Sequence, residues 1–65
     1  MNEKALSAYV QAMGQIEKYL SELQALANDH LGNDPENINW GHVGSAIHLA
    51  ELLKEAADFA SNRAN

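Results

Sequence analysis

Apolar residues recur at steps of three and four positions through the first half of the chain, and this spacing predicts one long amphipathic helix over residues 3–31. The recurring positions form a single line, which we call the helix 1 seam: Leu6, Tyr9, Met13, Ile16, Leu20, Leu23, Ala27 and His30. Such a seam is expected to pack against other helices. Gly14 lies beside it, and close approach of another backbone would explain a glycine there.

The predicted helix is followed by a loop over residues 32–39. Gly32 is expected to adopt the left-handed conformation of a helix C-cap. Asp34 and Pro35 come next, and an aspartate before a proline is typical of the start of a short helical turn. Asn39 is a further expected N-cap, so a second helix is predicted to begin directly after it.

The second predicted helix, residues 40–61, is apolar over most of its circumference. Its polar residues fall on one narrow line, which we call the acidic line: His48, Glu51, Glu55, Asp58 and Asn62. The other sides carry a line of small residues with Val43 and Leu53, and a line of larger residues that includes Leu49, Leu52 and Phe59. Because one neighbouring helix covers only one line, the pattern predicts two neighbours, the first helix and a partner chain.

These patterns predict an all-α fold, a two-helix antiparallel hairpin that dimerises into a four-helix bundle. The expected dimer and core interface consists of Tyr9, Met13, Ile16, Leu20, Leu23, Leu49, Leu52, Leu53, Ala56 and Phe59. A chain of 65 residues buries little surface by itself, and no Cys is present to form a disulfide, so association is the expected source of further stability. In size and pattern the chain resembles plasmid-copy-number regulators that build a four-helix bundle from two helical hairpins, although it shares no residue motif with them.

The formal net charge of -5 limits the partners that we expect. The cationic residues are scattered along the chain: Lys4, Lys18, Lys54 and Arg63. A nucleic-acid surface needs clustered positive charge, so no nucleic-acid binding is predicted. The acidic residues are interpreted as a solvated surface; the alternative is an acidic decoy for a nucleic-acid-binding protein. No apolar run approaches the roughly 20 residues that span a bilayer, and the first residues do not resemble a signal peptide. We therefore expect no membrane partner and a soluble, cytoplasmic protein.

Three histidines raise a metal-binding alternative. His48 and Glu51 are one helical turn apart, but their order is the reverse of the Glu-x-x-His pairs in di-iron bundles, and the acidic line is expected to face water. The serines, Ser7, Ser21, Ser45 and Ser61, have no evident base partner, and there is no Cys nucleophile. The sequence therefore predicts no catalytic residue, no metal ligand and no cofactor. The predicted function is a homodimeric interaction or regulatory module with an unidentified protein partner; the alternative is a metal- or small-ligand-binding bundle.

The segment from Trp40 to Gly44 is the least generic part of the chain, because two glycines in the first turns of a helix are unfavourable. In the preferred interpretation, Trp40 folds over the open end of the hairpin, and Gly41 and Gly44 permit close approach of a neighbouring segment. In the alternative, Trp40, Gly41, His42 and Gly44 form a partner surface with Trp40 as its anchor.

Overall fold

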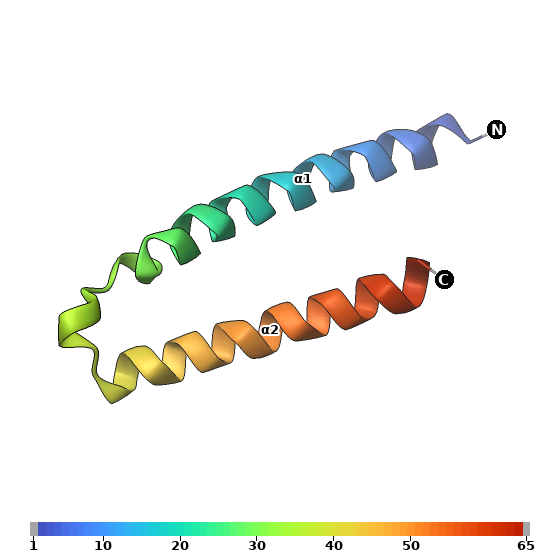
Figure 1. The fold of residues 1–65 in the computed structure, drawn as a ribbon. Helices are drawn as coiled ribbons and strands as arrows, with labels where there is room; N and C mark the ends of the chain where they lie inside the picture. The colour runs from blue at the N-terminus through green and yellow to red at the C-terminus, as the bar shows by residue number, and fades with distance from the viewer. Residues whose placement is uncertain (1, 65) are drawn as a thin grey trace. The chain divides into compact units, whose positions relative to one another are not determined.

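The computed structural model describes residues 2–64, and the side chains up to Asn62, and all regular secondary structure in this part is helical. It contains two long α-helices with two 3₁₀ turns between them: α1 (Glu3–Asn28), η1 (His30–Gly32), η2 (Pro35–Asn37) and α2 (Trp40–Ala64) (Figure 1). The all-α class and the presence of two helices are thereby confirmed. The chain divides after Gly32 into two units, one for each long helix, and each is described by itself.

The first turn of α1 is capped by the residue before it. The side-chain Oδ1 of Asn2 accepts a hydrogen bond from the Ala5 N–H at 3.0 Å, and the Asn2 carbonyl accepts one from the Leu6 N–H at 3.1 Å. Glu3 follows in the first turn, where its negative charge is favoured by the helix dipole. The start of the helix therefore combines side-chain and electrostatic stabilisation.

The end of α1 lies at Asn28, whereas the sequence pattern predicted residue 31. His30 and Leu31 both have a φ of 56°, and Gly32 has the left-handed conformation expected of it, with a φ of 78°. The helix ends early because Asn28, Asp29 and His30 are poor helix formers, and the short polar side chains compete for backbone hydrogen bonds. His30 consequently lies outside the helix, and the helix 1 seam stops at Ala27.

The turn η2 has the capping that its sequence predicted. The carboxylate of Asp34 accepts a hydrogen bond from the Glu36 N–H at 3.0 Å and another from the Asn37 side-chain amide at 2.6 Å. Pro35 occupies the first helical position, where its missing N–H costs no hydrogen bond. Local chemistry alone accounts for this turn.

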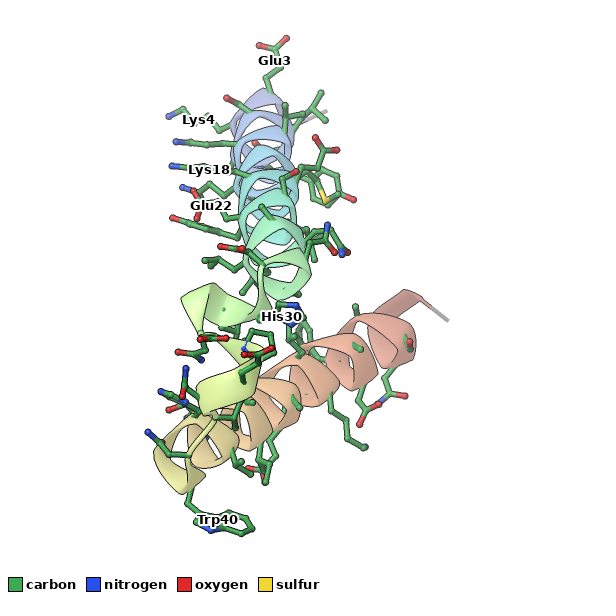
Figure 2. All side chains as sticks on the ribbon, turned by 60° about the vertical axis from the view of Figure 1, so that its left-hand side comes forward. Glu3, Lys4, Lys18, Glu22, His30 and Trp40 are labelled. Carbon is green, nitrogen blue, oxygen red and sulfur yellow. The ribbon has the colours of Figure 1, made fainter. Side chains whose placement is uncertain are left out.

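Along α1 the seam and a group of charged residues lie on different sides of the helix. Figure 2 shows Lys4, Lys18 and Glu22 projecting from the same side of the helix, and the helical register places the seam on the opposite side. None of the side chains of α1 is buried, and Ile16 at the middle of the seam is half exposed. Most helical stability in proteins comes from packing of the apolar side, so we expect another surface to cover the seam.

Gly14 offers a direct test of how closely that surface approaches. A Cβ built at Gly14 meets nothing within 4 Å, so Gly14→Ala fits the helix as described here. The substitution is expected to stabilise α1 by about 0.5–1 kcal/mol, because alanine restricts the unfolded backbone more than glycine does. Thermal unfolding followed by circular dichroism measures the change. A lower melting temperature in Gly14→Ala would show instead that a partner backbone occupies this position.

Candidate interaction surface

The first turn of α2 is held by a reciprocal pair of side chains. The Oδ1 of Asn39 accepts a hydrogen bond from the His42 N–H at 3.0 Å, and the Nδ1 of His42 accepts one from the Asn39 N–H at 3.2 Å. The Asn39 carbonyl also accepts the first helical bond, from the Val43 N–H at 3.1 Å. This arrangement is a capping box in which histidine takes the place of the usual Glu or Gln. Because Nδ1 accepts, the ring proton of a neutral His42 lies on Nε2.

The capping box also explains one of the two glycines. A Cβ at Gly41 would lie 3.1 Å from Oδ1 of Asn39, which is tighter than ordinary contact. Glycine at this position therefore leaves room for the capping oxygen. A Cβ at Gly44 meets nothing within 4 Å, so no such crowding accounts for Gly44.

Trp40 is 86% exposed, and its side chain extends away from the first turn of α2 (Figure 2). The preferred sequence interpretation, in which this indole packs over the end of the hairpin, involves segments beyond the unit of α2 and stays a prediction. Trp40 is the first residue of α2, and from this position its side chain points away from its own helix. An exposed Trp fits the alternative interpretation, in which it is an anchor for a partner.

The register of α2 places Trp40 on a particular side of the helix. Gly44, Ile47 and Glu51 follow it at steps of four, three and four residues, so all of them share one side, which is also the side of the acidic line. Ile47 is 54% exposed there. The sequence pattern alone grouped Ile47 with the apolar residues of α2 and missed that it shares a side with Trp40. The spacing of residues 40, 44, 47 and 51 would have shown this.

The acidic line continues along the same side of α2. Lys54 and Asp58 form an ion pair at 2.8 Å, and within the described side chains this is the one salt bridge. Both groups are largely exposed, so the pair contributes little to stability. Glu51 and Glu55 have no cationic partner among the described side chains, and their negative charge is available to a partner molecule.

The residues predicted for the dimer and core interface lie on the other sides of α2 and on the seam of α1. Leu23 and Leu49 are half-buried, and the rest are exposed: Tyr9, Met13, Ile16, Leu20, Leu52, Leu53, Ala56 and Phe59. No described residue is buried, so this set forms no core within either unit. Its role between chains remains a prediction.

Residues 2–64 contain no group of three or more His, Cys, Asp or Glu side chains placed to hold a metal ion. No helix in the same range combines the length and the apolar composition needed to cross a membrane. Neither finding identifies a ligand, and the exposed surfaces of α1 and α2 are the features to be explained.

Comparison with known proteins adds no relative. No protein-family model matches this chain, and neither the curated proteins nor the solved structures that were compared with it give a match.

The capping box predicts a measurable contribution to the stability of α2. Asn39→Ala removes the acceptor for the His42 N–H and is expected to lower the free energy of unfolding by about 1 kcal/mol. His42→Glu is the matched control, because glutamate is the usual acceptor at this position and its charge suits the helix N-terminus. Urea unfolding followed by circular dichroism compares them. If Asn39→Ala unfolded at the same urea concentration as the parent, the box would contribute nothing.

Proposed function

We propose that this chain is a small interaction module that works as a homodimer, in which two helical hairpins cover the apolar sides of each other's helices. The observation that carries the proposal is the exposure of apolar side chains along both long helices. Ile16 on α1 and Leu53 on α2 are 49% and 40% exposed, and both lie at the centre of apolar sides that extend over several turns. A surface of this kind is typical of a protein that associates.

The energetics favour association over a lone hairpin. Each large apolar side chain contributes about 1.5–3 kcal/mol when it is fully removed from water, and a half-exposed side chain contributes only part of this. One antiparallel neighbour covers a single side of α2, but apolar residues occupy the rest of its circumference outside the acidic line. A second copy supplies two more helices with the same pattern, which completes a four-helix bundle.

The dimer has a thermodynamic signature that tests the proposal. When folding is linked to association, the stability of the folded state rises with protein concentration. We expect the urea midpoint of the full chain to increase between low-micromolar and high-micromolar protein. A midpoint that does not change with concentration would contradict the homodimer.

Metal analysis of protein purified without an affinity tag separates this proposal from the ligand-binding alternative. The homodimeric module needs no metal for folding, so its helix content is expected to withstand a chelator. A stoichiometric metal whose removal unfolds the protein would favour a metal-binding bundle instead.

A further inference from the structure

We propose that α2 carries a second docking surface, on the side away from its main apolar residues, and that this surface binds a basic amphipathic helix of another protein. We call it the Trp40 stripe, and it consists of Trp40, Gly44, Ile47, Glu51, Glu55 and Asp58. The inference rests on the proposed function in one respect: the homodimer uses the other sides of α2 and leaves this stripe in water.

The stripe begins with an apolar half. Trp40 and Ile47 are two helical turns apart on the same side of α2, a separation of about 10 Å along the helix. Both are exposed, and Gly44 between them bears no side chain and has open space around it. A partner side chain can therefore contact the indole and Ile47 together. Tryptophan is among the residues that most often dominate the free energy of protein–protein binding.

The second half of the stripe is acidic. Glu51 and Glu55 follow Ile47 on the same side, and neither has a cationic partner among the described side chains. Asp58 is already paired with Lys54 at 2.8 Å. A partner that places Lys or Arg opposite Glu51 and Glu55 gains charge complementarity, which mainly contributes specificity and a faster association rate.

The apolar half followed by the acidic half along one helix indicates which kind of partner fits the Trp40 stripe. An amphipathic helix presents side chains at steps of three and four residues, which matches the spacing of the Trp40 stripe. Its apolar side chains would meet Trp40 and Ile47 while its basic ones meet Glu51 and Glu55. A nucleic acid or an anionic membrane is disfavoured, because both would bring negative charge against these carboxylates.

The test uses the full-length chain and a synthetic probe. The probe is a fluorescein-labelled helical peptide with leucines on one side of its first half and lysines on the same side of its second half. Binding is measured by fluorescence anisotropy at low salt. We expect Trp40→Ala to weaken probe binding by about tenfold or more, as for an interface anchor. The same variant is expected to keep the parent's helix content and oligomeric state, because Trp40 is exposed.

Two double variants with equal net charge separate a specific surface from general attraction to an acidic protein. Glu51→Gln with Glu55→Gln is expected to weaken binding by about tenfold, since charge complementarity at the docking surface is lost. Glu3→Gln with Glu22→Gln changes the net charge equally, on α1, and is expected to leave the affinity within about threefold.

Three results would overturn the second docking surface. The first is equal weakening by the two double variants, and the second is a Trp40→Ala variant that binds the probe as the parent does. The third is loss of self-association in Trp40→Ala, which would place the stripe inside the dimer. A monomeric parent whose probe binding still depends on Trp40 and Glu51 would contradict the homodimer and support the docking surface.

Discussion

Leu53→Glu is expected to abolish self-association and with it most of the helix content of the full chain. Leu53 lies on the apolar side of α2 opposite the acidic line, and in the homodimer it is covered by neighbouring helices. A glutamate there would be a buried charge without a partner, which costs roughly 3–5 kcal/mol. A small domain has little stability in reserve, so a loss of this size unfolds it. Gel filtration and circular dichroism of the variant measure both effects.

Ile47→Glu is the matched control for this prediction. Ile47 is on the same helix and is similarly exposed, at 54% against 40% for Leu53, but it lies on the side of the Trp40 stripe. Its replacement by glutamate is expected to leave the dimer intact and to weaken binding of the basic probe helix. Equal effects of the two substitutions on self-association would mean that the assignment of the sides of α2 is wrong.

Ile16→Lys is expected to have a comparable effect through α1. Ile16 is at the middle of the helix 1 seam, where a lysine would place its charge against the helices that cover the seam. We expect the melting temperature to fall by about 10 °C or more, because each kcal/mol of lost stability lowers it by about 4–8 °C in a domain of this size. Thermal unfolding at a fixed protein concentration gives the value.

Gln11→Lys provides the same change of charge on the opposite side of α1. Gln11 belongs to the polar side from which Lys4 and Lys18 project, so a lysine there stays in water (Figure 2). Its effect on the free energy of unfolding is expected to stay within about 0.5 kcal/mol. A large destabilisation by Gln11→Lys would show that the polar side of α1 is also covered.

The elements that the sequence predicted well depend on local chemistry. Asp34 and Asn39 were expected as caps from their type and position, and both accept the hydrogen bonds that define a cap. The end of α1 was placed too late because the pattern was followed up to Gly32, whereas the residues before it already favour a turn. Helix ends depend on the balance of several weak preferences, which a periodic pattern does not contain.

The candidate surface was only partly predictable. Trp40 was recognised as unusual, but its exposure depends on the direction of the side chain at the first residue of α2, which composition does not reveal. Ile47 required the register of the helix from Trp40 onward. The Asn39–His42 pair was missed because histidine is an uncommon residue at that place in a capping box; the spacing Asn-x-x-His was the available signal.

Sedimentation equilibrium of the untagged full chain tests the central claim most directly, provided that circular dichroism is recorded on the same samples. The homodimer predicts a particle with the mass of two 7.1 kDa chains at micromolar concentration, and a loss of helix content as dilution separates the chains. A single 7.1 kDa chain that stays fully helical and unfolds cooperatively across that concentration range would contradict the account.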